Sequence, residues 1–328
     1  MSNETVWERI EDLDRSGFAG EERRKRRMMA GDFDEFKVGE SLLEVREPLV
    51  GLPERLFTVV IDGVLWGGYK TVSDYVVERD MPGVFCSRVY PHNLLGPVVN
   101  FRVSEADARL VTRYVDDEER RSAFSRITGI TEITYPFPKY SSPGIEKRSA
   151  AEGWRVSEER AQFLAMGEEH LRAYTHQRLA SRLPQGRELV AFDPACSTGR
   201  FLSEFAAHAA TPIRTIGQDL SEAMVGYAAK VLDEVHHGDA RFPAVAPGSV
   251  DVLFSRFLNS EVVTVEQART ILPSLVSCLR PGGLFVMFGH SPVLLETADL
   301  ESAGLVVEQV SGRLDGAVFQ YVIARDDR

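Results

Sequence analysis

Hydrophobic positions follow two different patterns along the chain, and the pattern changes near residue 155. Beyond residue 185, short apolar runs alternate with amphipathic stretches, and the runs lie at residues 188–192, 213–217, 249–254 and 284–288. Runs of this length between turn residues are typical of buried parallel strands that are connected by helices. The pattern therefore predicts an α/β domain over residues 156–328, which begins with a long helix and ends in a strand hairpin.

Residues 1–155 show a less regular pattern, in which turn residues often interrupt the apolar runs. The run at 56–61 predicts a strand, and Trp66-Gly67-Gly68-Tyr69 predicts a turn with aromatic flanks. Residues 104–121 predict a helix, because the segment is rich in acids and Ser104 can cap its start. We expect these residues to form a second region of mixed α/β structure.

The net charge and the hydropathy of the chain limit the classes of binding partner that we expect. The 328 residues carry a formal charge of −11, which argues against a broad basic face for nucleic acid. No apolar stretch approaches the ~18 residues of a membrane span, and the charged N-terminus lacks the apolar core of a signal peptide. We therefore expect a cytoplasmic protein whose partner is a small molecule, without nucleic acid or membrane.

The cysteines and histidines do not form a metal-binding pattern. Cys86, Cys196 and Cys278 lie far apart, which indicates neither a metal pair nor a disulfide framework. His236 and His237 are adjacent on an expected strand, so their side chains would point to opposite faces. The sequence predicts no metal site.

A loop of small residues follows the first predicted strand of the α/β domain. Asp193-Pro194-Ala195-Cys196-Ser197-Thr198-Gly199 separates the apolar run 188–192 from a predicted helix at 200–208. Small side chains let a ligand approach the backbone, and the helix N-terminus offers unpaired N–H groups. This order predicts a nucleotide-binding loop in which Asp193, Ala195, Cys196, Ser197 and Gly199 lie against the ligand.

Two acidic residues follow the next two strands. Asp219 lies 20 residues beyond Gly199, where an acid can accept hydrogen bonds from both hydroxyls of a ribose. Asp239 follows the third strand and can accept from an adenine amino group. The alternative for Asp193 and Asp239 is a structural role, as a helix cap or an Asx turn. The neighbouring positions complete the predicted cofactor site, namely Leu220, Met224, Ala240 and Ser255.

The substrate side is expected at the carboxyl ends of the fourth and fifth strands, where open parallel sheets bind ligands. The segments 255–261 and 289–291 lie there, and they contain Arg256, Asn259, Glu261 and His290. His290 suits a general base and Arg256 suits an anionic oxygen. Tyr135, Tyr69 and Trp66 lie beside turns, as pocket walls often do, and ordinary core packing is the alternative interpretation. A structural hydrogen bond is the alternative role for each polar candidate.

Residues from about 185 to 328 resemble the class I S-adenosylmethionine-dependent methyltransferases. The family's first loop has the pattern D-x-G-x-G-x-G, which residues 193–199 match with Ala195 and Ser197 in place of two glycines. Leu279-Arg280-Pro281-Gly282-Gly283 matches the family's turn before the fifth strand. The resemblance implies a Rossmann-like seven-stranded sheet, S-adenosylmethionine as cofactor, and an N-terminal region that serves as acceptor site or lid. A homodimer formed through that region is left open.

Two related functions are weighed against this one. The opening Asp193-Pro194-Ala195-Cys196 resembles amino-methylating DNA methyltransferases, but Ser255–Leu258 lacks their N-P-P-Y motif and the acidic charge disfavours DNA. A nicotinamide-dependent oxidoreductase would share the first two strands and the acid, yet it prefers G-x-G-x-x-G at the turn. A protein that binds the cofactor without catalysis is a third alternative.

A narrower resemblance concerns bacterial natural-product methyltransferases that methylate α-keto acids at carbon. It rests on residues 257–263 and 288–292. It implies C3-methylation of an acid such as 5-guanidino-2-oxopentanoate, with His290 removing the proton and Arg256 holding the enolate or carboxylate. Glu261 would pair with the guanidinium group. O- or N-methylation of another small natural product is the alternative.

Overall fold

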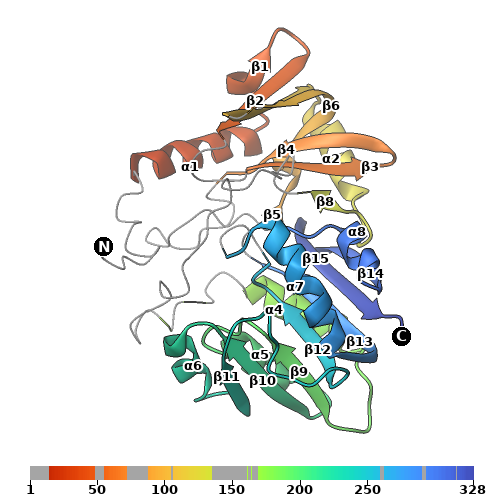
Figure 1. The fold of residues 1–328 in the computed structure, drawn as a ribbon. Coiled ribbons are helices and arrows are strands. Elements are labelled where there is room, and N and C mark those ends of the chain that lie inside the picture. The colour runs from red at the N-terminus through yellow and green to blue at the C-terminus, as the bar shows by residue number, and fades with distance from the viewer. Residues whose placement is uncertain are drawn as a thin grey trace.

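The computed structural model describes residues 15–48, 55–71, 88–104, 106–134, 161, 164, 169–258, 262–289, 293–314 and 316–328. Within these residues the chain forms two sheets, which Figure 1 shows one above the other. We call them the N-terminal sheet and the C-terminal sheet. The division into domains at residue 155 falls outside the described residues and stays a prediction.

The C-terminal sheet has the strand order β11-β10-β9-β12-β13-β15-β14. Its strands are β9 (Leu189–Asp193), β10 (Ile213–Asp219), β11 (Glu234–His237), β12 (Val250–Ser255), β13 (Leu279–Phe288), β14 (Leu305–Leu314) and β15 (Ala317–Asp326). The strands β9 to β13 are parallel, whereas β15 runs antiparallel to both β13 and β14. This is the predicted Rossmann-like sheet of seven strands, closed by the predicted terminal hairpin. The short strand β5 (Arg88–Val89) adds to it by pairing with β15.

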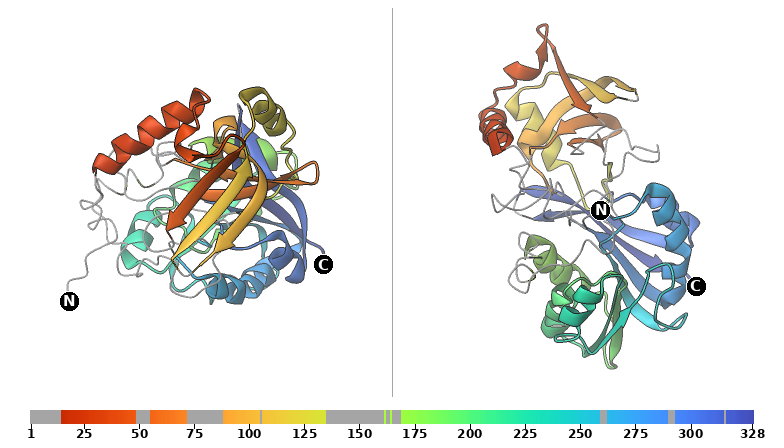
Figure 2. Two further views of the ribbon diagram at one scale, coloured as in Figure 1. Left: turned by 90° about the horizontal axis from the view of Figure 1, so that it is seen from above. Right: turned by 60° about the vertical axis from the view of Figure 1, so that its left-hand side comes forward.

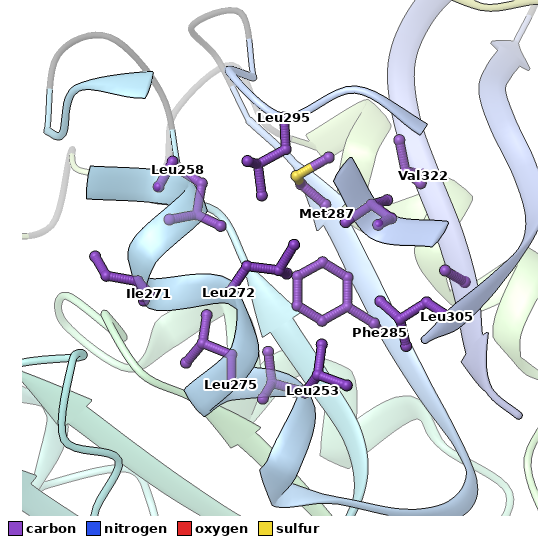
Figure 3. Close-up of a cluster of buried hydrophobic side chains, with 14 of the residues drawn as sticks. Leu253, Leu258, Ile271, Leu272, Leu275, Phe285, Met287, Leu295, Leu305 and Val322 are labelled. Atoms are coloured by element: carbon purple, nitrogen blue, oxygen red, sulfur yellow. The ribbon is translucent and has the colours of Figure 1, made fainter. Parts of the chain in front are cut away.

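Helices cover both faces of the C-terminal sheet. The alternation along β13 decides which side chains face each layer, because Phe285 and Met287 belong to one core cluster and Val286 and Phe288 to the other. Figure 3 shows the first cluster, where Leu272 of one helix packs towards the sheet. That helix is α7 (Val265–Cys278), and α8 (Thr297–Ser302) contributes to the same cluster. The second cluster contains residues of α4 (Glu169–Leu179), α5 (Arg200–His208) and α6 (Glu222–Ala228).

The N-terminal sheet is antiparallel throughout and has the order β1-β2-β7-β6-β4-β3-β8. Its strands are β1 (Lys37–Val38), β2 (Leu42–Pro48), β3 (Leu56–Ile61), β4 (Val64–Tyr69), β6 (Leu94–Val103), β7 (Asp107–Arg113) and β8 (Ile133–Thr134). The helices α1 (Arg15–Met29) and α2 (Asp117–Ser125) accompany it, with short 3-10 turns η2 (Asp34–Phe36) and η4 (Pro91–Asn93). Figure 2 shows this sheet in front of the C-terminal one when the molecule is seen from above, and above it in the second view.

The helix predicted over residues 104–121 is wrong. The structure has β7 over Asp107–Arg113 of this segment, and α2 begins only after Asp116, whose side chain accepts from the backbone N–H of Glu119. Ala108, Leu110 and Thr112 alternate into the buried face of β7. The period of two therefore decides the fold of this segment, and the positions between the buried residues, Arg109 and Val111, are partly exposed strand residues.

The turn predicted at residues 66–69 is also wrong, because these residues lie in β4. A Cβ atom at Gly68 would lie 2.0 Å from the Phe57 ring, so glycine is needed there for close packing and not for a turn. Trp66 and Tyr69 are buried in the two N-terminal core clusters. Their role is therefore core packing, which was the alternative interpretation of these two residues.

The N-terminal sheet lies beside the carboxyl ends of the parallel strands. Phe288, the last residue of β13, pairs with Tyr321, and the preceding residues of β15 pair with β5. Val318 of β15 is part of an N-terminal core cluster. Arg313 donates to the carbonyl oxygens of Phe124, Ser125 and Ile127 at the end of α2. The terminal hairpin thus joins the two sheets. Among the described residues, no helix has the length and apolar character that crossing a membrane requires.

Candidate functional site

The predicted cofactor residues gather at one edge of the C-terminal sheet. They follow β9, β10, β11 and β12, whose parallel pairing brings their carboxyl ends to the same side, here called the carboxyl edge. The strand order reverses between β9 and β12, which are direct neighbours. A crevice at such a reversal is where open α/β sheets bind ligands.

The loop after β9, residues 194–199, is held tightly against β10. Cys196 donates its backbone N–H to the carbonyl of Gln218 at 2.9 Å. Ser197 and Gly199 have positive φ angles of 52° and 75°. A Cβ at Gly199 would lie 2.9 Å from Leu232, so only glycine fits this start of α5. The loop therefore brings its backbone, rather than large side chains, to the carboxyl edge.

Asp219 ties this loop to the next helix. Its Oδ2 accepts from the backbone N–H of Ser197 at 2.8 Å, and its Oδ1 accepts from that of Ser221 at 2.8 Å. Ser221 in turn caps α6 by accepting from the backbone N–H of Met224. Burial raises the pKa of Asp219, and the two backbone donors oppose that shift. Each carboxylate oxygen retains a second lone pair for a further donor.

Cys196 and Met224 support the loop from inside. Both are buried, and the Ser197 hydroxyl lies 3.7 Å from the Met224 sulfur. Burial strongly raises the pKa of the Cys196 thiol, so at neutral pH the group is a neutral packing group and not a nucleophile. Leu220, by contrast, leaves an exposed apolar side chain between Asp219 and α6.

Asp239 is engaged by its own turn. Its carboxylate accepts from the backbone N–H and the guanidinium of Arg241, and this pairing lowers its pKa. The buried side chain of Gln218 holds the same turn, because it donates to the carbonyls of Asp239 and Phe242 and accepts from Ala244. Ala240 is half-buried within this turn. Gln218 is a supporting residue that the sequence reasoning missed.

Two residues at the end of β12 differ in their partners. The hydroxyl of Ser255 is fully buried and has no hydrogen-bond partner in the described part of the chain. Arg256 donates from Nε to Oδ2 of the fully buried Asp193 at 3.2 Å. Asp193 also accepts from the backbone N–H of Ala195 at 3.1 Å. The structure therefore places Arg256 against the first loop.

The other catalytic candidates, Tyr135, Asn259, Glu261 and His290, lie outside the described residues. Their described flanks nevertheless meet. The backbone N–H of Leu294 donates to the carbonyl of Leu258 at 2.9 Å. The buried amide of Gln320 accepts from the backbone N–H of Val293 at 3.1 Å and donates to the carbonyl of Ile133 at 3.3 Å.

Gln320 thus connects the segment that ends before Tyr135 with the segment that follows His290, and Leu294 of the latter contacts the segment that ends before Asn259. The sequence reasoning missed this residue as well. The available signal was a lone glutamine within the apolar strand VFQYVIA, because a buried amide in such a strand needs hydrogen-bond partners.

His236 and His237 have separate partners. His236 pairs with Glu234, whereas the ring of His237 contacts the carbonyl of Leu220. The described residues contain no group of three or more histidine, cysteine, aspartate or glutamate side chains arranged for a metal ion.

Comparison with known proteins identifies the family. Residues 191–283 match a family described as a methyltransferase domain. Isonocardicin synthase of Nocardia uniformis subsp. tsuyamanensis is 37% identical over 284 residues, which cover 84% of this chain and 92% of that protein. The chain belongs to the class I S-adenosylmethionine-dependent methyltransferases. S-adenosylmethionine is therefore the cofactor of this methyltransferase.

Two solved structures resemble the methyltransferase at lower identity. S-adenosylmethionine-bound CalS10, an amino pentose methyltransferase from Micromonospora echinaspora, is 17% identical with a TM-score of 0.41, over 52% of this chain and 98% of that chain. DesVI of Streptomyces venezuelae is 19% identical with a TM-score of 0.40, over 53% and 100%. The strand order itself distinguishes the methyltransferase from a nicotinamide-dependent enzyme, because an antiparallel β15 lies between β13 and β14.

Proposed function

We propose that this methyltransferase transfers a methyl group to a small-molecule acceptor of natural-product biosynthesis, bound where the carboxyl edge faces the N-terminal sheet. The supporting observation is the arrangement at that edge, where Asp219 holds both the first loop and the start of α6. The acceptor would lie beside the flanks that Gln320 connects.

The residues present fit S-adenosylmethionine. Within the described residues, the Ser255 hydroxyl at the carboxyl edge is a buried polar atom without a hydrogen-bond partner, and the first loop presents backbone instead of bulky side chains. We assign the ribose of the cofactor to Asp219. The adenine side is assigned to Leu220, Asp239 and Ala240. The methionine side is assigned to residues 193–199, with Met224 beneath them and Ser255 beside them. When bound, the cofactor supplies a methyl carbon attached to a positively charged sulfur.

The chain's own residues orient the acceptor and move its proton. The acceptor atom forms a bond to the methyl carbon, while the electron pair of the broken carbon–sulfur bond stays on sulfur. An acceptor that attacks through oxygen or carbon must lose a proton, and we assign its removal to His290. In-line approach at about 3 Å provides much of the rate enhancement, and we assign the positioning of the acceptor to the segments that Gln320 connects.

The acceptor's chemistry is the finer part of the proposal. C3-methylation of 5-guanidino-2-oxopentanoate, with Glu261 paired to the guanidinium, remains our prediction from the narrower resemblance. Arg256, which that prediction assigned to the enolate or carboxylate, instead contacts Asp193. Asn259 and Tyr135 are the remaining candidates to contact the acceptor.

A labelled-cofactor assay tests the proposal. The purified protein is incubated with methyl-labelled S-adenosylmethionine and a panel containing α-keto acids, phenols, amines and precursors of isonocardicin-type compounds. Transfer of label with release of S-adenosylhomocysteine supports it. A sulfonium has three carbon substituents, so release of methylthioadenosine with an unlabelled product would show attack at another carbon and contradict methyl transfer. Binding without turnover of any acceptor would favour a non-catalytic protein.

A further inference from the structure

We propose that Arg256 is a positioning residue that fixes the first loop for cofactor binding and does not bind the acceptor. This inference rests on the proposed function, since it assumes that residues 193–199 hold the methionine side of the cofactor. It reassigns an arginine whose position at the carboxyl edge had suggested contact with an anionic acceptor.

The first support is the contact with Asp193. Nε of Arg256 lies 3.2 Å from Oδ2 of Asp193, and the other carboxylate oxygen accepts from the backbone N–H of Ala195. One carboxylate therefore links the guanidinium to the backbone of the first loop. Asp193 is fully buried and the Arg256 side chain is only 13% exposed, so little of the guanidinium is open to an acceptor.

The second support is the ring of Phe201. The guanidinium carbon of Arg256 lies 4.7 Å from the centre of this ring, within cation–π distance. Phe201 is buried in α5 and packs edge-on against Phe254 of β12 at 5.0 Å between centroids. The arginine is thus held by a carboxylate and by a ring that is itself fixed in the core.

The third support is the place of the pair in the sheet. Asp193 ends β9 and Arg256 directly follows β12, and these two strands are neighbours where the strand order reverses. The ion pair therefore connects the ends of these two strands at the reversal. Without the arginine, the buried carboxylate of Asp193 would lose its charged partner. The first loop would then rearrange, because an unpaired buried charge is unfavourable.

The test separates cofactor binding from acceptor binding. Calorimetry measures the Kd of S-adenosylmethionine for the wild type, Arg256→Gln, Arg256→Lys, Asp193→Asn and the double variant Asp193→Asn/Arg256→Gln. We expect Arg256→Gln to raise the cofactor Kd by about tenfold, the loss of one charged hydrogen bond. Arg256→Lys should restore part of the affinity. The double variant should bind no more weakly than the worse single variant, because both changes break one interaction.

Arg200→Gln is the matched control. Arg200 is an exposed arginine in the first turn of α5 and pairs with Glu204 on the surface, so its replacement should leave the cofactor Kd unchanged. Should Arg256→Gln not fold, Arg256→Lys and the double variant provide the same comparison.

Different results would overturn the inference about Arg256 and the proposed function. An unchanged cofactor Kd in Arg256→Gln and Arg256→Lys, with a raised acceptor KM, would return Arg256 to the acceptor and overturn this inference alone. Additive losses in the double variant would also overturn it. A wild type that does not bind S-adenosylmethionine at all would instead overturn the proposed function.

Discussion

The two sheets hold their functional residues in different ways. At the carboxyl edge of the C-terminal sheet, the candidate site residues are bound to one another, as Asp219 is to Ser197 and Arg256 to Asp193. The N-terminal region reaches this edge through the terminal hairpin, where Gln320 contacts the Ile133 carbonyl of β8 and Arg313 contacts the Ser125 carbonyl of α2. The difference indicates that cofactor affinity and acceptor binding can be altered separately.

The largest expected effect is on the acceptor side. Replacement of His290 by alanine removes the proposed base, and we expect kcat to fall by about 10²- to 10⁴-fold. The cofactor Kd should not change, because the cofactor residues hold one another in place. Steady-state kinetics and calorimetry on the same preparation check both parts. A variant with the wild-type rate would remove His290 from the mechanism.

The second effect is on the cofactor side. Asp219→Ala removes the proposed ribose ligand and the acceptor for two backbone N–H groups, so the cofactor Kd should rise by about 100-fold. Glu222→Ala is the control, because Glu222 is an exposed acid at the start of α6, the helix that follows Asp219. Calorimetry that finds equal affinities in both variants would refute the assignment of Asp219.

The third effect tests the connection between the sheets. Gln320→Met keeps the volume of the side chain but leaves the Ile133 carbonyl and the Val293 N–H without their partner. We expect the free energy of unfolding to fall by about 1–3 kcal/mol and the acceptor KM to rise, with an unchanged cofactor Kd.

Gln309→Met is the matched control for Gln320→Met. Gln309 is a buried glutamine of β14, in the same hairpin, and its amide donates to Tyr174 and Ser311. This control should lower stability without a change in acceptor KM. A similar rise in acceptor KM in both variants would show that Gln320 has no special link to the acceptor side.

The smallest effect is on the pH dependence of cofactor binding. Burial raises the pKa of Asp219 above its ordinary value of 3.8, so the group takes up its proton at a higher pH than an exposed aspartate. The protonated group accepts fewer hydrogen bonds, and affinity should therefore fall as the pH is lowered into the acid range, and at a higher pH than for an exposed aspartate. Calorimetric titrations across this range measure the fall, and Asp219→Asn should flatten it. An equal fall in that variant would assign the titration to another group.

Sequence reasoning succeeded where local signals agreed with the tertiary structure. The strand at 56–61 and the helix at 200–208 match β3 and α5. It failed at residues 104–121, where acids and a capping serine imitate a helix start although alternate side chains are buried. Such a segment fits both the helix-start pattern and the alternating strand pattern. Its pairing with the neighbouring strands β2 and β6 stabilises the strand.

In the candidate site too, local signals were predictable from the sequence, whereas long-range contacts were not. The first loop and Asp219 were predictable, because small residues and an acid at strand ends carry a local signature. The contact of Arg256 was not, since its partner Asp193 lies 63 positions away along the chain. Gln320 binds a carbonyl 187 positions away, and no spacing rule covers such a pair.

The amino-acid sequence by itself determined the parallel strands, the small-residue loop and the acids that follow the strands, and from these the family and its cofactor. Only the tertiary structure decided what each polar group contacts at the carboxyl edge, and that the terminal hairpin joins the two sheets. The physical reason is the range of the interactions. Hydrophobic periodicity and turn chemistry act over a few residues, whereas a buried charge or amide takes its partner from whichever strand the fold places beside it.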